Sequence, residues 1–99
     1  MVEHPLKIFE KLDPEVLNLV ANTGELALAD GALPKRIKLL IAMALDASHG
    51  AVQRVKALAQ LATQAGASKE EITEALGVAQ YVSGVGSVHT AASVLRELF

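Results

Sequence analysis

Helix start and stop signals recur along the whole sequence, and they constrain the fold more than any other feature. Asp13, Pro14 and Glu15 supply an N-cap, a proline at the first helical position and an acid in the first turn. Ser68 and Glu71 have the spacing of a capping box, in which each side chain accepts a hydrogen bond from the backbone amide of the other residue. Alternating β-branched runs, which would predict strands, are scarce. The sequence therefore predicts an all-α fold.

Between these signals, apolar residues recur at helical spacing and divide the chain into five or six helices. The expected segments are 5–12, 14–29, 34–48, 51–65, 68–82 and, after an interruption at 83–87, a last helix through 88–98. The segment that begins at Pro34 is apolar on every side until Asp46, which predicts a central helix packed in all directions. Ninety-nine residues suffice for one compact core, so we expect a single domain over residues 1–99, with 1–13 as an N-terminal extension or short helix.

The excess of apolar residues points to self-association. The chain is 52 % hydrophobic and has a mean hydropathy of +0.36. A domain of this size buries only about two-thirds of the surface that its unfolded chain exposes. Apolar residues beyond that capacity favour a subunit interface, so we expect a homo-oligomer.

Composition also excludes several classes of function. A net charge of −2 lacks the basic surface that nucleic-acid binding needs. The absence of cysteine excludes thiol catalysis, disulfides and cysteine-ligated metals, and is in keeping with a cytoplasmic protein. The uncharged stretch Ala75–Leu95 is about long enough to span a bilayer, but its polar residues and glycines argue against a membrane helix. The first residues carry charges and no apolar run, so no secretory signal is expected.

Several features follow one another in a family-specific order. An apolar helix ends at Gly50, the run Ala-Gly-Ala-Ser-Lys-Glu-Glu-Ile occupies residues 65–72, and Tyr81 precedes a glycine-rich turn at 84–87. In this arrangement residues 33–98 resemble the carboxymuconolactone decarboxylase family, which includes the AhpD-like alkylhydroperoxidases. The resemblance implies an AhpD-like helical bundle that assembles into homotrimers or homohexamers. It also implies peroxiredoxin (alkylhydroperoxidase) or lactone decarboxylase activity.

The catalytic set of that family is replaced in this chain. Its peroxidase members carry a glutamate on the central helix and a Cys-x-x-Cys-x-x-x-His motif at the start of the next helix. In the register fixed by Gly66, these positions correspond to Leu39, Ala51, Arg54 and Leu58. The decarboxylase branch keeps a histidine where this chain has leucine. Disulfide exchange needs an attacking thiolate, so we expect no thiol peroxidase activity.

Other polar residues could form a different site at the same junction. His49 follows Asp46 by three residues, so the carboxylate could orient the imidazole as a general base, and His89 after the glycine-rich turn could join them. Such a site would act on a small organic acid, a lactone or a peroxide. The structural alternative is that Asp46 and His49 merely end a helix and that His89 bonds a backbone carbonyl. The histidines at 4, 49 and 89 lack metal-ligand spacing, so neither a metal nor a cofactor is expected.

Two functions therefore remain open from the sequence. The first is a catalytic protein with a remodelled site built from His49, Asp46 and His89. The second is a non-catalytic helical oligomer or a small-molecule binding protein.

Overall fold

The computed structural model describes residues 5–99 and is built from helices joined by short connections. In chain order the elements are a 3₁₀ turn η1 (Pro5–Ile8), α1 (Phe9–Leu12), α2 (Pro14–Leu28), α3 (Lys35–Ser48), α4 (Val52–Gln64), α5 (Lys69–Ser83) and α6 (Val85–Leu98). No strand occurs within residues 5–99, so the prediction of an all-α fold is confirmed.

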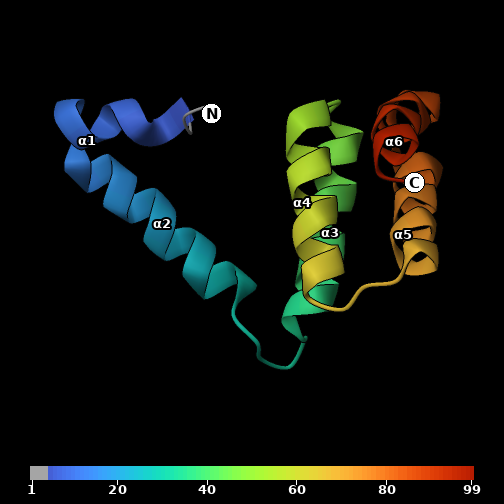
Figure 1. Ribbon diagram of the computed structural model, residues 1–99, viewed down its shortest axis with the longest axis horizontal. Helices are drawn as coiled ribbons and strands as arrows, with labels where there is room; N and C mark the ends of the chain where they lie inside the picture. Colours follow the sequence, from blue (N-terminus) through green and yellow to red (C-terminus); the bar gives the residue numbers. More distant parts are fainter. Residues whose placement is uncertain (1–4) are drawn as a thin grey trace.

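The helices fall into two parts (Figure 1). Helices α3 to α6 pack side by side and form the bundle, in which α3 contacts each of the other three helices. Residues 5–28 form an arm that diverges from the bundle and approaches it where α2 connects to α3. The hydrophobic core therefore belongs to the bundle.

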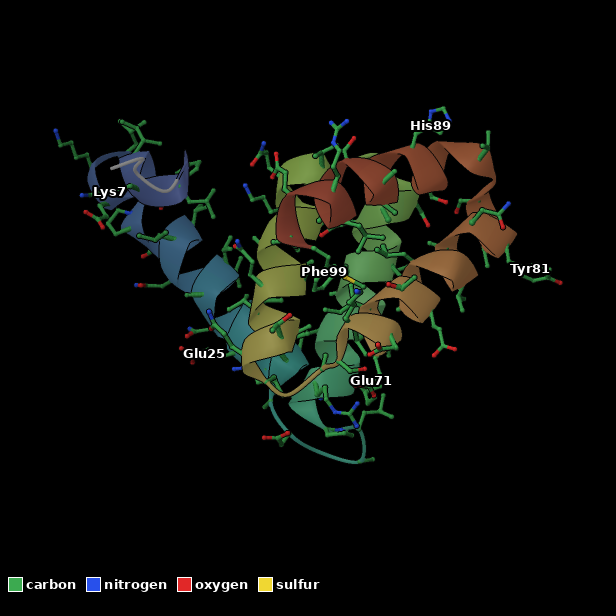
Figure 2. All side chains as sticks on the ribbon, turned by 45° about the vertical axis from the view of Figure 1, so that its right-hand side comes forward. Lys7, Glu25, Glu71, Tyr81, His89 and Phe99 are labelled. Atoms are coloured by element: carbon green, nitrogen blue, oxygen red, sulfur yellow. The ribbon has the colours of Figure 1, made fainter. Side chains whose placement is uncertain are left out.

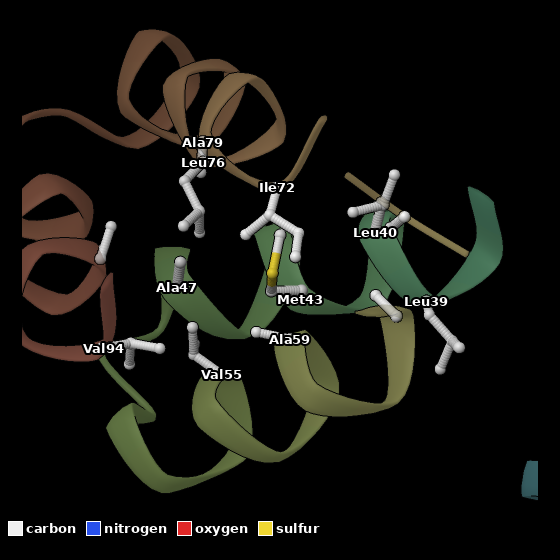
Figure 3. Packing of buried hydrophobic residues seen from close by; sticks show 13 residues of the cluster. Leu39, Leu40, Met43, Ala47, Val55, Ala59, Ile72, Leu76, Ala79 and Val94 are labelled. Carbon is white, nitrogen blue, oxygen red and sulfur yellow. The ribbon is translucent and has the colours of Figure 1, made fainter. Parts of the chain in front are cut away.

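Small and medium-sized apolar side chains fill this core (Figure 3). The largest fully buried apolar side chains are Leu39, Met43, Ile72, Val55 and Val94. Alanines at the helix contacts let the backbones come close together. Fully burying one leucine, isoleucine or methionine side chain contributes roughly 1.5–3 kcal/mol, so these few residues account for much of the stability of the bundle.

Both predicted caps are present. Asp13 Oδ1 accepts a hydrogen bond from the Val16 amide at 3.4 Å. Ser68 Oγ accepts from the Glu71 amide at 3.0 Å, and Glu71 Oε1 accepts from the Ser68 amide at 2.9 Å. These bonds satisfy backbone donors that no helical carbonyl can reach, which is why α2 and α5 begin where the sequence predicts.

The central helix α3 is not covered on every side. Leu39 and Met43 are buried in the core, whereas Ile41 and Leu45 on the outer side are 46 % and 58 % exposed. The prediction of a helix packed in all directions is wrong for this outer side. The physical reason is that the arm diverges from the bundle (Figure 1) and does not cover Ile41 and Leu45.

A single residue, Gly84, separates α5 from α6. Its φ of +87° lies in a region that side chains with a Cβ rarely adopt. The interruption is shorter than the predicted 83–87, because Val85 already begins α6 and the Ser87 hydroxyl donates to the Gly84 carbonyl at 2.9 Å. The uncharged stretch is thereby split between two helices. Within the described residues, none of the helices has the length and apolar character that crossing a membrane requires.

Candidate functional site at the α3–α4 junction

The candidate site residues lie where α3 ends and α4 begins. The backbone amides of His49 and Ala51 both donate to the Asp46 carbonyl at 3.1 Å, which closes the turn. Gly50 has a φ of +71°, the left-handed conformation that glycine adopts at least cost. A Cβ placed on Gly50 would lie 4.0 Å from Thr90 Oγ1, so the turn lies against α6.

The Asp46 carboxylate pairs with Arg54. Arg54 Nε donates to Asp46 Oδ2 at 3.0 Å and thus links the end of α3 to the first turns of α4. The Asp46 side chain is only 14 % exposed, whereas that of Arg54 is 76 % exposed. A largely buried carboxylate needs a cation or donors, and the guanidinium supplies both. No sequence pattern predicts this pair, because eight residues and a turn separate the two side chains.

His49 and His89 lie at the same end of the bundle, and both side chains are exposed. The Gly50 turn lies near Thr90, so the chain neighbours His49 and His89 lie at the same end of the bundle. Figure 2 shows His89 projecting outward from α6. An imidazole in open water exchanges its proton with solvent as readily as with a ligand, so a general base here needs a cover from outside the chain.

The third histidine, His4, lies outside the described residues. Among residues 5–99, no three histidine, aspartate or glutamate side chains gather closely enough to hold a metal ion.

Structural residues occupy the four positions that correspond to the family's peroxidase set. Leu39 is 1 % exposed within the core, and Leu58 packs against the same cluster. Ala51 is the N-cap residue of α4 and makes no side-chain capping bond. Arg54 is the partner of Asp46. None of these side chains provides a thiol, a carboxylate or an imidazole, so these positions lack the groups that peroxide reduction by thiols uses.

Two other ion pairs tie the bundle helices together. Arg36 of α3 pairs with Glu71 of α5, and Lys56 Nζ of α4 lies 2.7 Å from Glu97 Oε2 of α6. The hydrogen bond from the Ser68 backbone, followed by that from Arg36, lowers the pKa of Glu71 below its ordinary value. The hydrogen bond and charge of the Lys56 ammonium lower the pKa of Glu97. Because both pairs face solvent, they mainly orient the helices.

The bundle and its α3–α4 junction define an all-helical bundle protein. The sequence profile described as the carboxymuconolactone decarboxylase family matches residues 14–97. The crystal structure of an apo carboxymuconolactone decarboxylase family protein from Legionella pneumophila is similar, with a TM-score of 0.85 and 34 % identity. The match covers 93 % of this chain and 85 % of that chain. The chain belongs to the carboxymuconolactone decarboxylase family. A comparison with curated protein sequences gives no match.

The structural match also bears on the arm. The segment from the α2–α3 connection to the C-terminus makes up residues 29–99, so a match over 93 % of the chain extends well into the arm. The crystal structure from Legionella pneumophila therefore shares much of this divergent element as well as the bundle.

Proposed function

We propose that this chain is a carboxymuconolactone decarboxylase family protein without thiol peroxidase activity, which works as a non-catalytic helical homo-oligomer. The burial of Leu39 is the observation that carries the proposal. Where the peroxidase members place a catalytic glutamate, this chain places an apolar side chain inside its core, and none of its 99 residues is a cysteine. The change is therefore more than the loss of one reactive group.

The excess of apolar residues in the sequence supports self-association. We infer a homotrimer or homohexamer, the states that the family resemblance implies, in which copies of the chain cover the exposed apolar residues. A small organic acid or lactone is the ligand class that the resemblance suggests for a binding role. The proposed setting is the cytoplasm, where a chain without disulfides needs no oxidising environment.

A peroxidase assay tests the loss of thiol chemistry. With dithiothreitol as reductant and hydrogen peroxide or tert-butyl hydroperoxide as oxidant, the purified chain is expected to consume peroxide no faster than buffer does. The matched control is the double variant Ala51→Cys, Arg54→Cys, which restores a Cys-x-x-Cys pair and is expected to add slow thiol-dependent consumption. Turnover by the unmodified, cysteine-free chain would overturn the proposal.

A second candidate function is catalysis by His49, with Asp46 and His89 as neighbours. The nearness of the Gly50 turn to Thr90 supports it, because His49 and His89 are their chain neighbours. In an assembly, a second copy covering this end would supply the water exclusion that a general base needs.

A substrate screen separates the two functions. If a lactone, organic acid or hydroperoxide is turned over, His49→Ala is expected to abolish that turnover and to leave the molar mass of the oligomer unchanged. Glu74→Ala, a change of an exposed residue on α5, is the control and keeps full activity. Equal turnover by His49→Ala and the unmodified chain would eliminate the catalytic candidate.

A further inference from the structure

The arm has no hydrophobic core of its own. Helix α2 is fifteen residues long, and none of its residues is buried. An isolated helix of about 12–15 residues is only marginally stable in water, and most helices in proteins are held by packing of one apolar side. Leu28 at the end of α2 packs against the bundle core, and the rest of the helix exposes its apolar side chains.

One side of α2 carries exposed apolar residues at helical spacing. We call Val16, Leu19, Val20 and Leu26 the arm stripe, and their exposed fractions run from 36 % to 81 %. The first three follow an i, i+3, i+4 pattern and Leu26 lies seven residues after Leu19, which places all four on one side of the helix. Asn18 and Asn22 lie beside the stripe on the polar side of α2. The pattern is that of a helix surface that packs against another helix.

The chain exposes more surface than a compact monomer of its mass would, and this surplus has the size of a subunit interface. The chain exposes 6907 Å². A compact monomer of this mass exposes about 5,400 Å². The surplus of about 1,500 Å² per chain exceeds the roughly 800 Å² that each partner contributes to a stable interface. The Cα radius of gyration of 14.4 Å likewise exceeds the value of about 12.6 Å for a compact chain of this length.

A second exposed apolar surface lies on the bundle. We call Val78, Tyr81, Val82 and Val85 the α5 row; they lie at the end of α5 and the start of α6, and Tyr81 is 87 % exposed. The first three repeat the i, i+3, i+4 spacing of the arm stripe, and no charged residue interrupts 75–95. Tyr81 lies on the opposite side of the molecule from the arm in Figure 2. In Figure 1, α5 likewise lies on the side of the bundle that is away from the arm.

We propose that the arm stripe of one copy of the chain packs on the α5 row of a second copy. The two surfaces match in helical spacing and in lack of charge, and they lie too far apart within one molecule to satisfy each other. Two different surfaces on opposite sides make a head-to-tail contact, which closes into a ring when the rotation between copies allows it. This inference rests on the proposed homo-oligomer and names the surfaces that build it.

Single lysine substitutions test each surface. Leu19→Lys in the arm stripe and Val82→Lys in the α5 row are both expected to reduce the molar mass in light scattering to that of the 10.4 kDa monomer. Asn18→Lys and Gln80→Lys, the matched changes beside each surface, are expected to keep the mass of the unmodified oligomer. Because all four side chains are exposed, the bundle tolerates each lysine, and a retained thermal unfolding transition verifies this.

Mixing the two defective chains tests the head-to-tail pairing itself. A Leu19→Lys chain keeps an intact α5 row, and a Val82→Lys chain keeps an intact arm stripe, so an equimolar mixture is expected to form a heterodimer of twice 10.4 kDa. A contact between two arms would not be restored by mixing.

The outcomes separate the inference from the proposed function. A monomeric unmodified chain would overturn the homo-oligomer and this contact together. An oligomeric unmodified chain whose mass survives Leu19→Lys or Val82→Lys would overturn only the assignment of surfaces. A mixture that stays monomeric would overturn the head-to-tail pairing.

Discussion

At the scale of single residues, Leu39 shows how this chain differs from the peroxidase members of the family, which carry a glutamate at the matching position. Leu39 belongs to the buried core cluster and is 1 % exposed (Figure 3). A carboxylate placed there would lose its hydration. In this chain, position 39 therefore serves the packing of the core.

The variant Leu39→Glu tests how much the apolar side chain at position 39 contributes to stability. We expect the variant to lose about 3–5 kcal/mol of unfolding free energy, because an uncompensated charge replaces a buried apolar side chain. Urea unfolding followed by circular dichroism gives the value. Leu39→Met, which keeps the volume, is the control and is expected to cost less than about 1.5 kcal/mol. A glutamate variant as stable as the methionine variant would show that a charge is accommodated.

Glu71 couples the start of α5 to pH. Its pKa is lowered in the folded chain by the Ser68 backbone hydrogen bond and then by Arg36. The folded chain therefore favours the carboxylate form. The stabilisation is fully present above the ordinary pKa of about 4.5 and is lost as pH falls through the lowered value.

Glu71→Gln is expected to flatten this pH dependence. Unfolding free energy measured between about pH 6 and about pH 3 should fall less steeply for the variant than for the unmodified chain. Glu74→Gln, on the same helix, is the control and should keep the unmodified slope. Identical slopes for all three chains would show that Glu71 does not contribute to the pH dependence of stability.

At the scale of elements, local chemistry made most helices predictable. Asp13 and Ser68 begin helices because their side chains satisfy amides within three residues, a relation that the sequence displays directly. The direction of the arm was not predictable, because a six-residue connection at 29–34 sets it and no local pattern encodes the angle.

The candidate site was less predictable for the same reason. Asp46 and His49 are neighbours in sequence, but the Asp46 side chain turns to Arg54 across the junction. That choice depends on how α3 and α4 pack, which periodicity does not reveal. The exposure of His49 and His89 likewise depends on the tertiary arrangement. Their catalytic role stays a prediction.

A substitution at Gly84 tests whether the break between α5 and α6 requires glycine. Its backbone combines a φ of +87° with a ψ of −171°, which is nearly restricted to glycine. Gly84→Ala is expected to lose about 1–3 kcal/mol of unfolding free energy. Gly86→Ala, inside α6 with open space around its missing Cβ, is the control and should gain up to about 1 kcal/mol. Equal effects of the two changes in urea unfolding would contradict this account.

At the scale of the whole molecule, folding and assembly should be linked. If copies of the chain cover the arm, dilution releases it and lowers the stability of the folded state. The thermal midpoint is therefore expected to rise with protein concentration over about a hundredfold range. Leu19→Lys, which disrupts the arm stripe, should remove most of this dependence. A midpoint independent of concentration in the unmodified chain would contradict the linkage.

The pair between Asp46 and Arg54 has a consequence for the environments that this protein tolerates. In the thiol members of the family, the matching turn carries sulfur atoms that oxidants and reductants interconvert. Here an ionic link spans that turn, and Met43 in the core is fully buried. We therefore expect the geometry of the junction to be the same under oxidising and reducing conditions.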